Sequence, residues 1–500
     1  MSASAGVYLD YAATTPVDPR VAAAMASCLT LEGDFGNAAS LHRYGRAAAA
    51  RIAEARAQVA VLVGATAEEI VFTSGATESN NLALLGVARA NADRGRHLIT
   101  ARTEHKAVLD PCKRLTREGF EVTYLTPERS GVVTPASVAA ALRPDTQLVS
   151  LMCVNNETGV LQDIAAIGAL CHARGVAFHS DCAQAAGKVP LDLGRLAVDF
   201  LAFTAHKVYG PKGIGALYVR RGARGLLQPV MFGGGQEQGW RPGTLATHQI
   251  VGFGVACAIA AQELATETTR LAQLRDQLWM RLSTLGGVHL NGAAAPRAPG
   301  ILNVSFEGIE GESLVSALDG IAVSTGAACN SASAEASYVL RALGRDAQLA
   351  ASSLRLSLGR FTEEREIESA AAAIGAAVRR LRALSPAAPP EARPAWEGGA
   401  KAGEAVVSGE AGGPGQETWV RFQLLICGDT VKDARFQAFG CPHTLDVAGW
   451  LCRELPGRSR ATLAPGEPAD WAANRAVPVE KLGRLLVIED ALRACLLQWR

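Results

Sequence analysis

Three groups of polar residues in the first half of the sequence could act together on one small molecule. Asp181 and Gln184 stand in the segment SDCAQ, Lys207 stands in TAHKVYGPKGIG, and residues 73–81 read TSGATESNN. A lysine amine can form a covalent adduct with an aldehyde, a carboxylate can hold a ring nitrogen protonated, and the amides of a helix N-terminus can hold a phosphate. Each group alone also has an ordinary explanation, because Ser and Thr often cap helices and most lysines lie at the surface.

These residues belong to a stretch in which short apolar strands alternate with helical patterns. We expect strands that end in polar residues at 97–105, 148–159, 176–184 and 198–207, with a helix at 163–175 between two of them. Alternation of this kind predicts a mostly parallel α/β sheet. Ligands of such sheets bind beyond the carboxyl ends of the strands, which is where these polar residues would gather.

The spacing of Asp181 and Lys207 fits such a sheet. The two residues are 26 positions apart (207 − 181), about one β-α-β unit, so successive strand ends can bring the acid and the amine to one cofactor. Residues 73–81 follow a strand and open a helix, which supplies a site for a phosphate. Pyridoxal phosphate needs this set: a Schiff-base lysine, an acid for the pyridine nitrogen and an anchor for the phosphate. The sequence therefore predicts a pyridoxal-phosphate enzyme.

Length and composition limit the other possibilities. The chain has 500 residues, of which 49% are hydrophobic and 19% charged, enough for about three domains with sizeable cores. The net charge of +1 gives no reason to expect nucleic acid or an anionic membrane as a partner. We find neither a secretory signal at the N-terminus nor an uncharged apolar run long enough to span a membrane. The eleven cysteines include no CxxC pair, so we expect a cytoplasmic protein with reduced thiols.

The composition and the predicted secondary structure of the sequence change twice in its second half. Residues 261–384 combine long helices with a few strands, which predicts a small α+β part that also takes residues 1–14, beside a large part at about 15–260. Residues 385–416 are rich in Pro, Gly, Ala and Glu and read as a flexible linker. Residues 417–500 begin with a predicted β-hairpin and continue with helical patterns, so we expect a third, small α+β domain.

Seven short motifs follow one another along the first 380 residues. They are LDYAATTP (9–16), TSGATESNNLALLG (73–86), TEHKAVL (103–109), NNETG (155–159), AHKVYGPKGIG (205–215), GGGQEQGWRPGT (233–244) and SYVLRALG (337–344). In this order they resemble the cysteine desulfurases of the NifS/IscS type, from about residue 7 to about residue 380. The resemblance implies a fold-type I pyridoxal-phosphate enzyme, normally a homodimer, that converts L-cysteine to L-alanine and keeps the sulfur as a persulfide.

The resemblance implies a role for each matched residue of the cofactor site. Lys207 matches the Schiff-base lysine, Asp181 the partner of the pyridine nitrogen, and Gln184 the residue that bonds the phenolic oxygen of the ring. His105 matches the histidine that stacks on the ring and can move protons. The implied phosphate ligands are Ala76 through its backbone amide, Thr77, Thr204, His206 and, for the cofactor of the neighbouring subunit, Thr244.

Asn156 and Arg355 match the pair that holds the substrate carboxylate in this family. An arginine suits that role because its planar fork meets a carboxylate with two hydrogen bonds. Taken singly, Asn156 could be a turn residue and Arg355 an exposed strand arginine, just as His105 could be a capping or core histidine. The order of the motifs favours the functional interpretation of all three.

The segment STGAACNSAS at 324–333 carries a thiol, Cys329, among small residues that fill no core. In the resembling family a cysteine in a mobile loop attacks the sulfur of the substrate adduct and carries it away as a persulfide. That chemistry requires an accessible thiolate, so the resemblance implies this role for Cys329. Six other cysteines lie in apolar or helical context, and we expect them to be small buried hydrophobes: Cys28, Cys112, Cys153, Cys171, Cys182 and Cys257.

The C-terminal sequence resembles a second family, the iron–sulfur scaffold proteins of the IscU/NifU type. The resemblance rests on VKDARFQAFGC at 431–441 and the helix-like segments after it. Such a scaffold holds a [2Fe–2S] cluster with three cysteines and a nearby aspartate. Here Cys441 matches one ligand, a possible remnant, but the other positions carry different residues. They fall near Gln416 and Thr418 and on Gly483 and Arg484. The resemblance therefore implies a degenerate scaffold.

Three interpretations of this domain stay open. It could hold a metal through Cys427, Cys441, His443 and Cys452, it could dock on the desulfurase or on another partner, or its Cys441 could accept sulfur from Cys329. For the whole chain, the alternatives to a desulfurase are an aminotransferase of the same fold and a non-catalytic assembly platform. Cys329 disfavours transamination, and the complete catalytic set disfavours the platform. The expected partners are L-cysteine and a sulfur-acceptor or iron–sulfur scaffold protein.

Overall fold

The computed structural model describes residues 6–293, 295–325, 336–384, 403–413, 418–464, 466–475, 477 and 481–499. The chain forms two compact units. The first comprises Met1–Phe306 and Leu318–Ala372, and the second comprises Glu307–Ala317 and Ala373–Arg500. Helix α11 (Glu364–Leu384) contributes residues to both units, because the division falls between Ala372 and Ala373.

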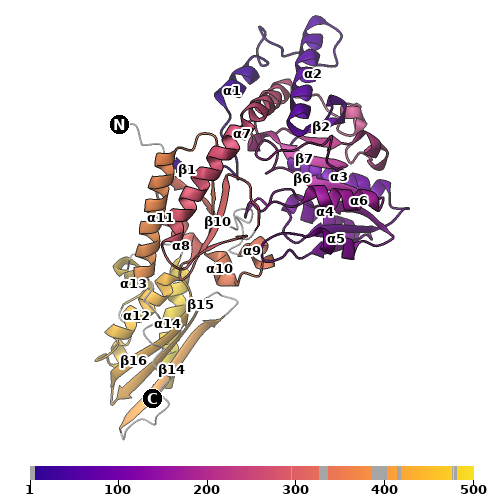
Figure 1. Ribbon diagram of the computed structural model, residues 1–500. Coiled ribbons are helices and arrows are strands. Elements are labelled where there is room, and N and C mark those ends of the chain that lie inside the picture. The colour runs from indigo at the N-terminus through magenta and orange to yellow at the C-terminus, as the bar shows by residue number, and fades with distance from the viewer. Residues whose placement is uncertain are drawn as a thin grey trace. The chain divides into compact units, whose positions relative to one another are not determined.

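The first unit contains a seven-stranded sheet (Figure 1). All its strands are parallel except β8, which runs against both of its neighbours, β7 and β2. The predicted mostly parallel α/β sheet is therefore confirmed. In spatial order the strands are β2 (Ile70–Thr73), β8 (Gly215–Val219), β7 (Phe200–Thr204), β6 (Ala177–Asp181), β5 (Thr146–Ser150), β3 (His97–Ala101) and β4 (Glu121–Leu125).

Helices cover both faces of this sheet, because successive side chains of each strand point to opposite faces. In β2, Ile70 and Phe72 pack into one apolar cluster and Val71 packs into another. Both clusters are fully buried, which explains the continuous apolar runs of these strands. The first face is covered by α2 (Arg43–Val63), α5 (Pro135–Ala141), α6 (Ile164–Ala173) and part of α7 (Thr247–Ser283), with α1 (Pro19–Ala26) beside them; the second is covered by α3 (Ala76–Ala90) and α4 (Lys106–Arg117).

Short 3₁₀ helices connect these elements. They are η1 (Ala67–Glu69), η2 (Ala205–Lys207), η3 (Arg221–Leu226) and η4 (Glu237–Gly239) in the first unit and η7 (Arg460–Thr462) in the second.

Helix α7 is the one element, within the described ranges, that is long and apolar enough to cross a membrane by length and composition alone. The sequence analysis anticipated no such run. Half of the apolar window is buried inside the structure, where Phe253 and Cys257 join the core of the sheet's first face. A buried core helix meets the same criterion, so the composition of α7 has a structural explanation.

A second, four-stranded antiparallel sheet lies in the same unit. Its spatial order is β12 (Ser324–Thr325), β13 (Ser353–Ser357), β10 (Ile301–Phe306) and β9 (Val288–Leu290). The N-terminal strand β1 (Val7–Tyr8) pairs in parallel with β11 (Ile321–Ala322), and α9 (Tyr338–Ala342) and α10 (Ala347–Ala351) complete this part. We placed a boundary between the large and small parts at residue 260. Helix α7 instead runs through it without a break.

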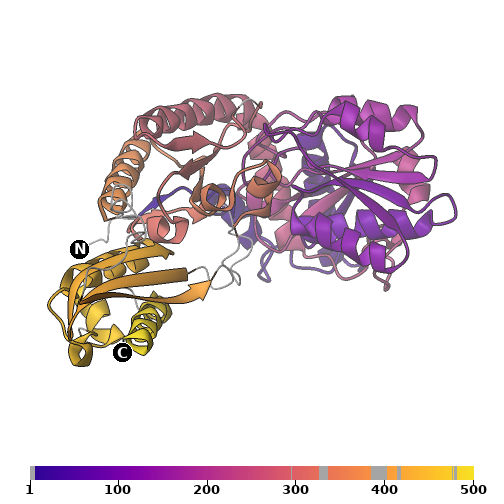
Figure 2. The ribbon, with the colours of Figure 1, turned by 90° about the horizontal axis from the view of Figure 1, so that it is seen from below.

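The second unit is a three-stranded antiparallel meander with helices (Figure 2). Every second residue of β15 from Thr418 to Ile426 is buried, so one face of the meander forms the core. The predicted hairpin is confirmed as β15 and β16. The strands are β14 (Glu404–Gly413), β15 (Thr418–Cys427) and β16 (Thr430–Phe439), and the helices are α8 (Gly311–Ser316), α12 (Pro442–Glu454), α13 (Pro468–Asn474) and α14 (Leu482–Gln498).

The linker prediction for residues 385–416 is wrong for residues 404–413. That stretch is strand β14, which pairs with β15 along ten residues. Its small residues have a packing role: a Cβ added at Gly409 would lie 2.3 Å from the carbonyl oxygen of Ala491 in α14. Glycine lets the helix approach the strand closely, and the same composition reads as a linker when the sequence is considered alone.

Candidate active site

A cavity of about 590 Å³ opens at the carboxyl edge of the seven-stranded sheet. It collects most of the residues predicted to hold cofactor and substrate, although they span some 280 positions of sequence (355 − 76 = 279). The predicted residues that line it are Ala76, Thr77, His105, Asn156, Asp181, Gln184, Thr204, His206, Lys207 and Arg355.

The sheet itself brings these residues together. Asp181 is the last residue of β6, Thr204 is the last residue of β7, and Lys207 ends the short η2 helix that follows. Strands β6 and β7 are parallel neighbours, so their carboxyl ends meet at one edge. The 26-residue spacing was interpreted as one β-α-β unit. The two strands do pair directly and in parallel, but the prediction of a helix between them is wrong, because residues 182–199 form turns and irregular backbone.

Asp181 is buried and held by two donors. The backbone amide of Ala183 donates to its Oδ1 at 2.9 Å, and the side-chain amide of Asn80 donates to its Oδ2 at 2.7 Å. The carboxylate is therefore fixed in orientation at the base of the cavity. A carboxylate held in this way can keep a ring nitrogen protonated.

Lys207 and Gln184 meet at the backbone of the N-terminal segment. The Lys207 Nζ donates to the carbonyl oxygens of Ala12 and Ala13, the latter at 2.6 Å, and the Gln184 Nε2 donates to the Ala12 oxygen at 2.7 Å. Both side chains are thus oriented from the same side of the cavity. Tyr209, two residues after Lys207, has φ 65°, a left-handed conformation that is uncommon for a bulky residue.

The start of helix α3 forms a wall of the cavity that suits an anion. Gly75 precedes the helix with φ 150°, and it caps the helix without a side chain. A Cβ at Gly215 would lie 2.6 Å from the Gly75 Cα, so glycine is needed there for strand β8 to pass the helix start. The first backbone amides of the helix, at Ala76 and Thr77, can hold a phosphate.

His206 and His105 are both kept neutral by their surroundings. Burial lowers the pKa of His206 to about 4, and the charges of Lys207, Lys212 and Lys188 act in the same direction. Burial also lowers the pKa of His105, although the negative charge of Asp181 acts in the opposite direction.

His105 begins helix α4, where its Nδ1 accepts the Ala107 amide at 3.1 Å. This contact fixes the ring nitrogen that faces the backbone and fixes the plane of the ring.

Arg355, on β13, reaches the cavity from the second sheet. Its guanidinium donates to the Asn156 carbonyl at 3.1 Å, to Asp10 at 2.9 Å and to Ser324 at 3.2 Å. Among the residues that the structure describes, its Nε and the Asn156 Oδ1 are buried side-chain atoms without a hydrogen-bond partner. Buried polar atoms without partners are rare, and at a cavity wall they are the groups a ligand would satisfy.

Comparison with known proteins agrees with this site. The class-V aminotransferase family matches residues 7–369. Cysteine desulfurase IscS of Azotobacter vinelandii is 59% identical over 381 residues, 76% of this chain and 94% of that protein. The chain belongs to the cysteine desulfurases of the class-V aminotransferase family.

Two solved structures extend the comparison. A NifS-like protein is similar with a TM-score of 0.70 and 36% identity, covering 75% of this chain and all (100%) of that one. A structure of SspA in complex with cysteine has a TM-score of 0.64 and 38% identity, covering 70% of this chain and 98% of that one.

Pyridoxal phosphate is the cofactor of this desulfurase family, and the cavity fits it. The uncapped start of α3 suits the phosphate, Asp181 suits the ring nitrogen, and the Lys207 amine can bind the aldehyde carbon. The fit rests on the side chains and backbone amides present at one edge of one sheet.

Two predicted residues are not part of this cavity. Thr244 is exposed and lies outside the lining, so its predicted role toward a neighbouring subunit stays a prediction. Cys329 lies outside the described residues. The six cysteines expected to be buried hydrophobes are buried as predicted.

The proposed metal site of the desulfurase's C-terminal unit is not formed. Cys427, Cys441, His443 and Cys452 are all described, yet the described parts of the chain contain no group of three or more metal-binding side chains. Cys441 is buried at the start of α12, with its Sγ 3.5 Å from the Thr444 hydroxyl, and Cys427 is exposed at the end of β15. The interpretation of this unit as a metal centre is therefore wrong for the described residues.

Sequence reasoning missed several residues in the cavity lining or in contact with it. Asn80, which orients Asp181, lies one helical turn after Ala76 in the TSGATESNN motif, and that spacing of four could have placed it on the same helix face. Asp10, the ion-pair partner of Arg355, lies in the LDYAATTP motif. Lys212 also lines the cavity.

Proposed function

We propose that this desulfurase converts L-cysteine to L-alanine and holds the sulfur as a persulfide on Cys329. Overall, the carbon–sulfur bond of the substrate breaks, a sulfur–sulfur bond forms to the Cys329 Sγ, and the thiol proton is balanced by a proton gained at the substrate carbon. The observation that carries the proposal is the convergence of an amine, a fixed carboxylate, a neutral imidazole and a partly unpartnered guanidinium in one cavity.

Each side chain has a task that its surroundings support. The bound cofactor supplies an electron sink that loosens the bonds of the substrate's α-carbon. Asp181 would hold the ring nitrogen protonated, and the Lys207 amine would attach the cofactor. Lys207 and the neutral imidazole of His105 can then accept and return protons near the reacting carbons, because a neutral base is available at neutral pH.

Arg355 and Asn156 orient the substrate. The carboxylate of L-cysteine would accept from the Arg355 guanidinium, whose Nε is buried without a partner among the described residues. The same anchor suits the alanine product, which carries an identical carboxylate. An aminotransferase would use the same anchor, so the proposal separates from that rival only through the fate of sulfur.

Measurement of alanine and sulfide formed from L-cysteine by the purified chain tests this function. Wild type should form both, Lys207→Ala should form neither and lose the covalently attached cofactor band, and Arg355→Lys should raise KM far more than it lowers kcat. Lys212→Met is a useful comparison, because it removes a second amine that lines the cavity. Formation of pyruvate or an amino-group exchange product in place of alanine would contradict the proposal.

We further propose that the enzyme is a cytoplasmic homodimer that passes sulfur to an acceptor or an iron–sulfur scaffold protein. Exposure of Thr244 outside its own cavity is consistent with a role at a second subunit's phosphate. In mixed dimers, a chain with Thr244→Ala should weaken cofactor binding in its partner's site and not in its own. Equal weakening in both sites would refute the assignment.

For the C-terminal unit we propose a degenerate scaffold-like fold that docks a partner. Acceptance of sulfur by Cys441 is disfavoured, since its side chain is buried with 3% of the residue exposed. Persulfide found by mass spectrometry on the peptide containing Cys441, after incubation with L-cysteine, would overturn this and make the unit a sulfur acceptor.

A further inference from the structure

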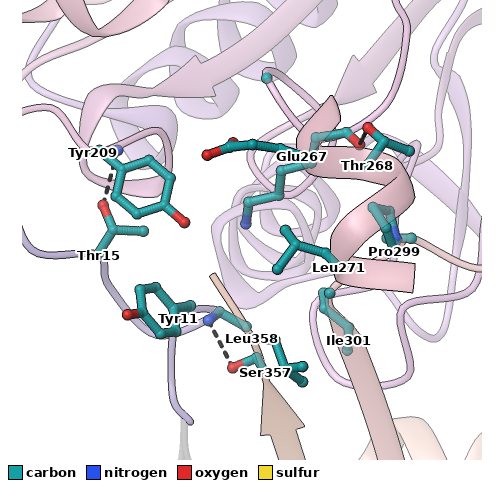
Figure 3. Close-up of a pocket in the computed structure, with 15 residues that line it drawn as sticks. Tyr11, Thr15, Tyr209, Glu267, Thr268, Leu271, Pro299, Ile301, Ser357 and Leu358 are labelled. Carbon is teal, nitrogen blue, oxygen red and sulfur yellow. Dashed lines mark hydrogen bonds between the residues drawn. The ribbon is translucent and has the colours of Figure 1, made fainter. Parts of the chain in front are cut away.

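A second, much smaller chamber of about 30 Å³, drawn in Figure 3, shares a lining residue, Ala12, with the active-site cavity. The backbone at Ala12 is a wall of both, and Figure 3 shows Tyr11, Tyr209, Glu267 and Leu271 around the chamber. A space of this size has room for about one or two water molecules. Its lining is mainly apolar, with a few polar groups such as Lys188, Glu267 and Thr268, and it shares the wall at Ala12 with the larger cavity.

Lys188 connects the two spaces. It lines the chamber, and its Nζ donates to the Oε1 of Gln184, which lines the active-site cavity, at 2.6 Å. Gly187 gives the chain the required turn, with φ 68°, and a Cβ there would lie 2.8 Å from the Val208 Cγ1. The Thr268 hydroxyl, on α7, makes only a long hydrogen bond of 3.4 Å to the Lys188 backbone carbonyl, away from the amine that contacts Gln184.

The hydrogen bonds of Gln184 show what this contact achieves. A glutamine amide has one oxygen that accepts and two N–H groups that donate. Here Lys188 occupies the oxygen, and one N–H donates to the Ala12 carbonyl at 2.7 Å. The second N–H remains for a ligand in the cavity, and the phenolic oxygen of the cofactor ring is the acceptor that the assignment of Gln184 requires.

We propose that Lys188 is a positioning residue, which fixes and polarises the Gln184 amide so that its second N–H is presented to the cofactor's ring oxygen. The inference rests on the proposed function, because it takes the role of Gln184 from there. A cationic donor on the amide oxygen strengthens the N–H groups of the same amide. Without it, the Gln184 oxygen would be left buried with one fewer partner, and the amide would be held from one side only.

The charge state of Lys188 is consistent with this contact. Burial lowers the pKa of Lys188 to about 7, and the charges of Lys207 and Arg355 act in the same direction. Lysine donates a hydrogen bond in both of its protonation states, so the contact with Gln184 holds on either side of neutral pH. Its polarising charge is present while the amine is protonated, below about pH 7, so binding is measured at pH 6.

Equilibrium binding of pyridoxal phosphate to the apo form of the full chain tests the proposal. The variants are Lys188→Met, Gln184→Met, the double variant and Thr268→Val, a control that loses a hydroxyl at the same chamber wall. Loss of one charge-assisted hydrogen bond should raise the cofactor Kd about tenfold in Lys188→Met. Because Lys188 acts through Gln184, the double variant should match Gln184→Met alone, and the cofactor absorption maximum should shift in both single variants but not in the control.

The possible results separate this inference from the proposed function. An unchanged Kd in Gln184→Met would overturn the role of Gln184 and the inference with it. A raised Kd in Gln184→Met together with an unchanged Kd in Lys188→Met would overturn the inference alone. Effects that multiply in the double variant, or an equal loss in Thr268→Val, would assign Lys188 a general packing role instead. Thermal unfolding of apo Lys188→Met is the control for misfolding. If the variant loses as much folding free energy as it loses cofactor-binding free energy, the proposal is also overturned.

Discussion

Glu157 carries a buried carboxyl group next to Asn156, the residue proposed to orient the substrate. Only 3% of the residue is exposed, and its Oε2 accepts a hydrogen bond from the Ser337 hydroxyl. Burial raises the pKa of Glu157 from 4.5 to about 7, although the Ser337 hydrogen bond and the charge of Arg355 oppose the rise. The folded protein therefore holds a proton at this site that the unfolded chain releases near pH 4.5.

The sign and size of the effect on stability follow from this difference. Between pH 4.5 and about 7 the folded state binds more protons than the unfolded state, so stability falls as pH rises. The shift of about 2.5 pKa units (7 − 4.5) corresponds to about 3 kcal/mol. Glu157→Gln keeps the shape and an acceptor for Ser337 but cannot ionise. We expect the variant to be about 3 kcal/mol more stable than wild type at pH 8 and only about 1 kcal/mol more stable at pH 5.

Urea unfolding of the cofactor-saturated chain at pH 5, 6, 7 and 8, followed by far-UV circular dichroism, measures this difference. Comparing variants at each pH cancels titrations elsewhere in the chain. Glu364→Gln, at the exposed start of α11, is the control and should follow wild type at every pH. If wild type and Glu157→Gln keep a constant separation from pH 5 to pH 8, the reasoning about this buried carboxyl is wrong.

Two further substitutions test other parts of the first unit. Gly215→Ala should weaken pyridoxal-phosphate binding roughly tenfold, because its Cβ would lie 2.6 Å from the Gly75 Cα at the start of α3; a cofactor titration with unchanged Kd would contradict this. Glu237→Gln should destabilise the fold by about 3 kcal/mol, since the buried carboxylate accepts from the Arg56 guanidinium at 2.7 and 2.5 Å and from the Phe72 amide at 2.7 Å. If the Glu237→Gln variant unfolds at the same temperature as wild type, this network contributes little to the stability of the fold.

The main sheet and the acid and amine of the site, Asp181 and Lys207, were predictable from local patterns, whereas other site residues, such as His105 and Arg355, were assigned through the resemblance to the desulfurase family. Apolar strands that end in polar residues, such as the one ending at Asp181, place chemistry at one edge of a parallel sheet whatever the rest of the fold does. The motif around Lys207 comes directly after the next strand, β7. The antiparallel direction of β8 was not predicted, because strand direction depends on pairing between distant segments and not on the strand's own residues.

The parts that were missed depend on tertiary packing. Strand β14 was taken for linker, because Gly409 looks like a flexible residue until helix α14 is packed against it. Lys188 and Asn80 act by contacting Gln184 and Asp181, and such contacts between side chains are specified by the fold as a whole. In the sequence, the one local indication of these contacts is spacing: Lys188 lies four residues after Gln184, and Asn80 lies four residues after Ala76.

The sulfur-carrying role of Cys329 is the central claim, and mass spectrometry of the chain after a single turnover with L-cysteine tests it most directly. Wild type should form one equivalent of alanine and carry one additional sulfur on the peptide that contains Cys329. Cys329→Ala should form almost no sulfide when a reductant is added. Cys427→Ala, which removes an exposed thiol from the end of β15 in the C-terminal unit, should behave as wild type. If Cys329→Ala releases alanine and sulfide as fast as wild type, the persulfide mechanism proposed for this enzyme is wrong.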